Sequence, residues 1–321
     1  MAKNKSNKKL VSSNSKIVTS NLLNTRGNHQ IKLGKHSLNH KIPEDNVEHT
    51  DEAISSVTIL SVPRSGSSWL GQIFNSSPDT VYRFQPNFAY SFPGKITAES
   101  TEKDIEDFKC NLLTTDDPFV LGTTPLAKRK SVPFSKGETS LLVWKEVHAL
   151  HLAEKLLRAP NTKVIGLVRS PFGVLASWAR APKEFDADWD LASEWQHAQK
   201  KNAGSIDKHY GFLAWKTITL DFLRLALQYP ERMRICSYRQ LIDDPEATVS
   251  QLFKYAELEF GEQTRDLLLG SSSETDEDPY STNKRVTRDD KWKSSLPQEI
   301  IDEIKSDPTY QRLQAIFNWQ K

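Results

Sequence analysis

Apolar and polar positions alternate in blocks along the chain from residue 57 onward, and five of the apolar blocks are short and rich in β-branched residues. Runs of about four to eight such residues, bounded by Gly, Pro or polar clusters, are typical of buried strands. We therefore expect five strands. They cover residues 57–62, 81–84, 141–148, 164–168 and 233–238.

Between these runs the apolar positions recur at helical spacing. The alternation of strands and helices predicts an α/β fold around a central, mainly parallel sheet. The segment 178–229 is helical in pattern and rich in tryptophan, which is more typical of core packing than of a sugar-stacking platform. One further helix is expected to follow residue 66 and another to begin at Ser170. Others are expected over 101–113, 151–158 and 246–255, and two more helices are expected at the end of the chain.

The loop after the first strand is the strongest candidate for chemistry. Its residues, in order, are Pro63, Arg64, Ser65, Gly66, Ser67, Ser68 and Trp69. A loop rich in Ser and Gly that leads into a helix aims backbone N–H groups, hydroxyls and the positive end of the helix dipole at one point. The guanidinium of Arg64 adds a permanent charge, so a phosphate or sulfate is the natural ligand. The alternative is a simple Ser-capped helix.

The loop does not match the pattern of ATP- and GTP-binding loops. That pattern requires Lys after its second Gly, whereas Ser67 follows Gly66 here. The fourth strand ends at Arg169 and not at an Asp that could hold magnesium. We expect arginine in place of a metal ion at this site.

Two further strands end in polar residues, at the edge where open α/β sheets bind ligands. The third ends in Lys145, Glu146 and His148; the alternative is a Lys–Glu surface pair. The fourth ends at Arg169, directly before the next helix. Arg64 and Arg169 therefore each lie between a strand and a helix N-terminus, and the two positions could hold two separated anionic groups of one ligand. His148 and His151 lack a third ligand, so we expect no metal site.

Composition limits the class of protein. The net charge of +2 over 321 residues argues against a dedicated nucleic-acid binder. The first 43 residues carry nine Lys or Arg and no acidic residue, so residues 1–52 are expected to be a disordered basic tail before one domain over 53–321. The dense mixed-charge segment 284–293 is either a surface turn or a loop that reaches back over the anion site.

Cysteine usage and hydropathy suggest a cytoplasmic protein. Cys110 and Cys236 are expected to be buried free thiols of a reducing compartment. No apolar stretch approaches the roughly 20 residues that a membrane helix requires, and the N-terminal residues show no hydrophobic signal segment.

Taken together, these motifs resemble the sulfotransferases that use 3′-phosphoadenosine 5′-phosphosulfate (PAPS), from about Val57 to the C-terminus. The resemblance implies a P-loop-like three-layer sandwich with PAPS as co-substrate. It implies that Arg64 to Ser68 hold the 5′-phosphosulfate and that Trp69 stacks on the adenine. Further implied nucleotide contacts are Arg169, Ser177 and Arg285 at the 3′-phosphate, with Arg288 as a rival of Arg285, and Tyr238 on the last strand near the adenine.

Segments 64–79 and 145–147 are most similar to the branch that acts on carbohydrate 6-hydroxyls. That branch commonly has Glu, a candidate base, where this chain has Gln85, and an amide has no useful basicity. Gln85 is therefore expected to bind the acceptor. The base is then His148 or Glu146, although strand alternation places Lys145 and His148 on opposite faces unless the strand ends between them.

The resemblance implies sulfuryl transfer from PAPS to an acceptor hydroxyl, with Lys145 and Arg64 stabilising charge on the bridging oxygen. The expected partner is a small-molecule or glycan acceptor, with no nucleic acid and no membrane span; the sequence does not fix the oligomeric state. The alternatives are a nucleotide kinase and a non-catalytic nucleotide or glycan binder.

Overall fold

The computed structural model describes residues 53–89, 92, 95–124, 133–270 and 288–319. These residues all belong to one compact unit, which begins at Asp51. The predicted tail over 1–52 lies outside the described residues. So do residues 284–287 of the mixed-charge segment, which include Arg285.

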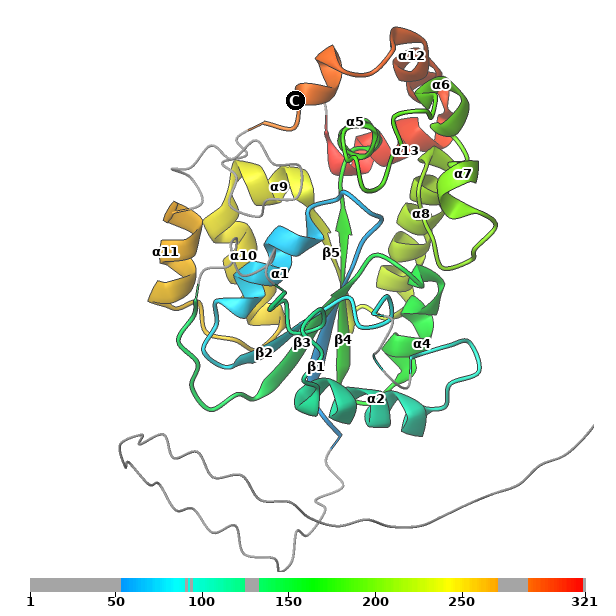
Figure 1. Ribbon diagram of the computed structural model, residues 1–321. Coiled ribbons are helices and arrows are strands. Elements are labelled where there is room, and N and C mark those ends of the chain that lie inside the picture. Colours follow the sequence, from blue (N-terminus) through cyan, green and yellow to red (C-terminus); the bar gives the residue numbers. More distant parts are fainter. Residues whose placement is uncertain (1–52, 90–91, 93–94, 125–132, 271–287, 320–321) are drawn as a thin grey trace, which may run out of the picture. The chain divides into compact units, whose positions relative to one another are not determined.

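A five-stranded, all-parallel sheet is the centre of this unit, in the order β2-β3-β1-β4-β5 (Figure 1). The expected α/β fold is therefore confirmed. Because the strands are parallel, their carboxyl ends share one edge, which gathers the loops that follow them. The strands are β1 (Ser56–Leu60), β2 (Thr80–Phe84), β3 (Leu141–Glu146), β4 (Thr162–Val168) and β5 (Met233–Ser237).

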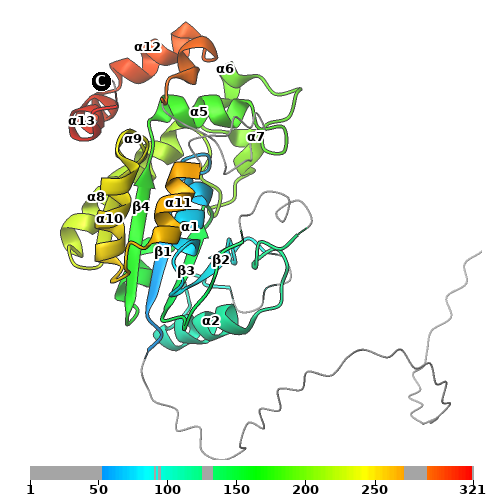
Figure 2. The same cartoon turned by 90° about the vertical axis from the view of Figure 1, so that its left-hand side faces the viewer.

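Helices cover both faces of the sheet and make three layers (Figures 1 and 2). Apolar side chains alternate along each strand, so one set packs with α1 and α10 and the other with α2, α4 and α8. The first face carries α1 (Ser67–Asn75), α9 (Tyr238–Asp243), α10 (Pro245–Tyr255) and α11 (Glu262–Gly270). The second carries α2 (Glu102–Thr114), α4 (Ala153–Arg158) and α8 (Phe212–Gln228).

The remaining helices gather toward the carboxyl ends of the strands, as Figure 1 shows for α5, α12 and α13. Those ends therefore lie beneath a cap of helices that come from distant parts of the sequence. The helices are α5 (Pro171–Ala179), α6 (Leu191–Glu194), α7 (Gln199–Asn202), α12 (Gln298–Ser306) and α13 (Pro308–Phe317), with short 3₁₀ turns η1 (Leu150–Leu152) and η2 (Lys291–Ser294).

Four expectations are corrected. Residues 178–229 are not continuously helical: Ala198 and Ala203, both at positive φ, bound α7, and Gly211, also at positive φ, precedes α8. The third strand ends at Glu146. Tyr238 is the first residue of α9 and not the end of a strand. Cys110 is exposed on α2; Cys236 is buried.

The tryptophan-rich segment supplies core residues. Trp178, Trp195 and Trp215 are all at least 95% buried, which agrees with core packing. Trp189 is partly buried and packs edge-on against Phe185.

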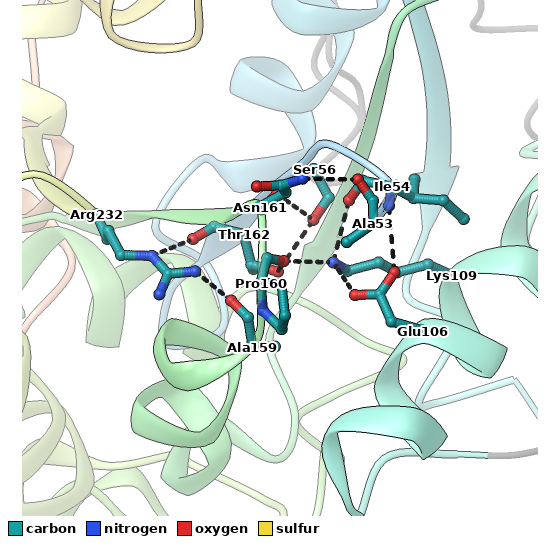
Figure 3. A network of polar contacts seen from close by, with 10 residues as sticks. All are labelled: Ala53, Ile54, Ser56, Glu106, Lys109, Ala159, Pro160, Asn161, Thr162 and Arg232. Carbon is teal, nitrogen blue, oxygen red and sulfur yellow. Dashed lines mark hydrogen bonds and ion pairs between the residues drawn. The ribbon is translucent and has the colours of Figure 1, made fainter. Parts of the chain in front are cut away.

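A polar network fastens the amino ends of β1 and β4 to α2 (Figure 3). The buried ammonium of Lys109 donates to the Glu106 carboxylate at 2.7 Å and to the carbonyls of Ile54 and Pro160 at 3.1 and 3.0 Å. Each N–H group of this ammonium has an acceptor, so we interpret the network as structural. It lies at the amino ends of the strands, opposite the edge that carries the candidate site. Among the helices described, none is long and apolar enough to cross a membrane.

Candidate active site

The loop between β1 and α1 presents an open helix N-terminus. Gly66, with φ of 96°, is the N-cap of α1; no side chain caps the helix and its first turn has no acidic residue. The hydroxyl of Ser65 is fully buried and has no partner among the described residues. Uncapped N–H groups and the helix dipole favour an anion at this point.

The ring of Tyr238 packs against the backbone of this loop at Gly66. A Cβ on Gly66 would lie 2.6 Å from Cε2 of Tyr238, and its positive φ would strain any L residue. Tyr238 also meets Trp69 edge-on, with ring centroids 6.4 Å apart. Position 66 therefore accepts only glycine without a shift of the loop.

We expect Gly66→Ala to reduce nucleotide affinity by about tenfold or more, since the added methyl group displaces the loop N–H groups from Tyr238 and from their ligand. Titration calorimetry with adenosine 3′,5′-bisphosphate measures the loss. Gly261→Ala, at a glycine with nothing within 4 Å of its would-be Cβ, is the matched control. Unchanged affinity in Gly66→Ala would remove the loop from the binding site.

Arg64 joins three segments. Its Nε donates to Oγ of Ser177 at 3.2 Å, and its Nη1 pairs with Glu184 Oε1 at 3.1 Å. Its carbonyl oxygen accepts from Nη1 of Arg169 at 2.8 Å. The structure thus brings together Arg64, Arg169 and Ser177, which the resemblance to the sulfotransferases assigned to two different groups of one nucleotide.

Arg169 follows β4 and is held by a carboxylate. Its Nη2 lies 2.6 Å from Oδ1 of Asp289, and its guanidinium carbon lies 4.7 Å from the ring centroid of Tyr238. Burial works against the charge, but Asp289 and the resulting hydrogen bonds keep the pKa of Arg169 above its usual value. The guanidinium is a permanent cation at this site.

Lys145 lies on β3, between β2 and β1, level with Phe84 of β2 and Ile59 of β1. It is 2% exposed, and its Nζ lies 4.5 Å from the centroid of the Phe84 ring. Burial lowers the pKa of this ammonium to about 7; Arg64 acts in the same direction, and Glu146 opposes it. A buried ammonium of this kind is stabilised by a nearby anion.

His148 is positioned by the end of β3. Because the strand stops at Glu146, alternation no longer dictates which face His148 occupies. Its ring stacks on Phe88, with centroids 4.6 Å apart, and its Nδ1 is buried without a partner among the described residues. Burial, followed by the charge of Lys145, lowers the pKa of His148 to about 4, so the imidazole is neutral at pH 7.

Glu146 and Gln85 shape the turn next to Lys145. Oε1 of the buried Glu146 accepts the backbone N–H of Asn87 at 2.7 Å, and burial raises the pKa of this carboxyl to about 8. Gln85 adopts φ of 45°, and its N–H donates to the carbonyl of Lys145 at 3.0 Å. Gln85 therefore lies beside Lys145, while Glu146 holds the turn.

Three residues at the site were not predicted from the sequence. Glu184 and Asp289 are the carboxylates on Arg64 and Arg169. Phe119 packs against Phe84 and Phe88, with centroids 5.3 and 5.8 Å apart, and completes an aromatic wall beside Lys145. The only sequence signal was the mixed-charge segment 284–293. Of its described residues, 288–293, Asp289 contacts Arg169 at the anion site, whereas Arg288 is exposed.

The residues present fit a nucleotide that carries two anionic groups. Arg169 contacts the carbonyl of Arg64 in the loop before α1, and the charge of Arg64 acts on Lys145. Trp69 offers a half-buried ring whose buried Nε1 has no partner among the described residues. Within the described ranges, no group of three or more His, Cys, Asp or Glu side chains is placed to hold a metal ion.

Residues 55–307 match the family model described as a sulfotransferase domain. Among solved structures, the chain is similar to the sulfotransferase domain from the curacin biosynthetic pathway, with 16% identity, coverage of 83% of this chain and 98% of that chain, and a TM-score of 0.42. It is also similar to a sulfotransferase from Alicyclobacillus acidocaldarius, with 14% identity, 84% and 100% coverage and a TM-score of 0.46.

Mouse sulfotransferase SULT7A1 complexed with PAP is a third similar structure, with 12% identity, 81% and 88% coverage and a TM-score of 0.44. At these identities the likeness concerns the fold. No curated protein matches the chain.

Proposed function

The chain belongs to the sulfotransferase domain family, and we propose that it transfers a sulfuryl group from PAPS to an acceptor hydroxyl on a carbohydrate. One observation carries the proposal: the buried ammonium of Lys145 lies level with the end of β1, from which the uncapped loop of Arg64 and Gly66 leads into α1. The family match over residues 55–307, which includes this whole site, supports the reaction.

We assign the 5′-phosphosulfate to the loop from Arg64 to Ser68 and the 3′-phosphate to Arg169 and Ser177. In-line attack on sulfur breaks the bond to the bridging oxygen, where negative charge develops. Lys145 donates a hydrogen bond to that oxygen, and the loop N–H groups share its charge. Because these donors are fixed before reaction, they stabilise the transition state more than the ground state.

We assign the acceptor's proton to His148. At neutral pH its imidazole is unprotonated, whereas Glu146 largely holds its proton and is engaged by Asn87. Gln85 is assigned to a hydrogen bond with the acceptor. The aromatic wall of Phe84, Phe88 and Phe119 supports a carbohydrate, since aromatic rings pack well on the apolar face of a sugar.

The pH dependence of kcat/KM follows from two of these groups. We expect it to fall as pH rises through about 7, because Lys145 then loses the proton it must donate. It should also fall as pH drops through about 4, because His148 is then protonated. A bound anion favours the ammonium, so the alkaline fall in kcat should lie at higher pH than that in kcat/KM. Steady-state rates from about pH 3 to about 9 test this. An alkaline limb that persists in Lys145→Arg at the same pH would assign it to another group.

The acceptor is tested by incubation with sulfur-labelled PAPS and a matched panel of glycans, phenols and lipids, without magnesium. Label on glycan hydroxyls supports the proposal. Label on phenols or lipids alone would retain the sulfotransferase and contradict the carbohydrate acceptor. Release of labelled sulfate with no labelled organic product in any class would contradict transfer to these acceptors.

A further inference from the structure

We propose that Asp289 is a carboxylate of this chain that competes with the 3′-phosphate of the nucleotide for Arg169, and so tunes the enzyme's affinity for 3′-phosphorylated nucleotides. The inference rests on the proposed function, in which Arg169 binds that phosphate.

Asp289 occupies one edge of the guanidinium. Its Oδ1 lies 3.1 Å from Nε and 2.6 Å from Nη2 of Arg169, and its Oδ2 lies 3.0 Å from Nε. The third nitrogen, Nη1, donates to the carbonyl of Arg64 at 2.8 Å. A guanidinium binds phosphate best through two parallel N–H bonds along one edge. The edge formed by Nε and Nη2 is occupied by Asp289, and the edge formed by Nη1 and Nη2 has a contact at each nitrogen. Both edges that could bind a phosphate therefore already contact this chain.

The carboxylate is placed by packing and is not a chance surface pair. The side chains of Arg169 and Asp289 are 15% and 9% exposed. A Cβ on Gly173 of α5 would lie 2.6 Å from both Arg169 Nε and Asp289 Oδ2, so the pair fills the space that glycine leaves. Trp292 stacks on Phe172 and donates its Nε1 hydrogen to the carbonyl of Asp289 at 2.9 Å, which fixes the segment.

Two anions on one guanidinium repel each other. A phosphate that contacts Arg169 would lie within about 5 Å of the Asp289 carboxylate, where repulsion is substantial even at an effective dielectric constant near 20. The 3′-phosphate therefore binds Arg169 against this repulsion or displaces Asp289 from a donor, and in either case the carboxylate weakens its binding. A nucleotide without a 3′-phosphate incurs no such cost. The bisphosphate product keeps its 3′-phosphate, so the same competition favours its release.

The test is Asp289→Asn, which keeps the shape and one acceptor oxygen but removes the charge. We expect the variant to bind adenosine 3′,5′-bisphosphate about tenfold more tightly than the wild type and to bind adenosine 5′-monophosphate unchanged. Asp290→Asn removes the neighbouring carboxylate, which makes no contact with Arg169 among those the structure describes, and should leave both affinities unchanged. Asp289→Ser is a second variant in case the first does not fold.

Unchanged or weaker binding of the bisphosphate by the folded variants would overturn the proposal and make Asp289 a support for Arg169. An equal gain for both nucleotides would overturn it as well, since the effect would not depend on the 3′-phosphate. Failure of the proposed function looks different: the wild type itself would bind the two nucleotides equally, and Arg169→Ala would change neither affinity.

Discussion

Lys145→Met is expected to lower turnover by on the order of a hundredfold or more while nucleotide affinity is retained, as for the loss of a single oxyanion donor. Lys145 is 2% exposed, so methionine fills nearly the same buried volume without its charge. Because burial already lowers the pKa of the ammonium to about 7, removing it should not lower the melting temperature.

The measurement is single-turnover transfer from labelled PAPS, together with titration of adenosine 3′,5′-bisphosphate. Lys163→Met is the matched control, because Lys163 lies near the amino end of another strand of the sheet, β4, and pairs with the exposed Glu257. Turnover within a few-fold of the wild type would remove Lys145 from the chemistry. Loss of nucleotide affinity together with turnover would make it a binding residue.

Arg169→Ala should have the largest effect on binding. We expect affinity for adenosine 3′,5′-bisphosphate to fall by about a hundredfold, the range for loss of a charge-assisted bidentate contact. Affinity for adenosine 5′-monophosphate should change little, because the group that Arg169 contacts is absent from it. The ratio of the two affinities is therefore the informative quantity.

Stability must be measured alongside, because the substitution leaves the buried carboxylate of Asp289 unpaired, and breaking such a pair costs about 3–5 kcal/mol. The double variant Arg169→Ala, Asp289→Asn removes that charge and separates folding from binding. Arg158→Ala is the control at an exposed arginine of α4. Equal losses for both nucleotides in the folded double variant would contradict the assignment of Arg169 to the 3′-phosphate.

The sheet was predictable because its signals are local. Each strand is a short apolar run, and each of the runs ending near Arg64, Lys145 and Arg169 leads into polar residues at one shared edge. The boundaries were less predictable. The third strand was predicted over 141–148, yet β3 ends at Glu146, and this difference frees His148 from the alternation of the strand.

Long-range partners were not predictable. Ser177 and Arg64 are 113 residues apart in sequence, and the spacing of either motif says nothing about the 3.2 Å hydrogen bond between them. The carboxylates of Glu184 and Asp289 come from segments whose local pattern is that of a solvated surface. These carboxylates pair with Arg64 and Arg169 only because of the way α5 and η2 pack in the folded protein. The local sequence pattern does not encode that packing.

Titration of the wild-type protein with adenosine 3′,5′-bisphosphate and with adenosine 5′-monophosphate, both without magnesium, tests the central claim most directly. We predict that the bisphosphate binds at least about tenfold more tightly, through the cations at Arg64 and Arg169. Equal affinities for the two nucleotides, or binding and turnover of ATP that depend on magnesium, would contradict it.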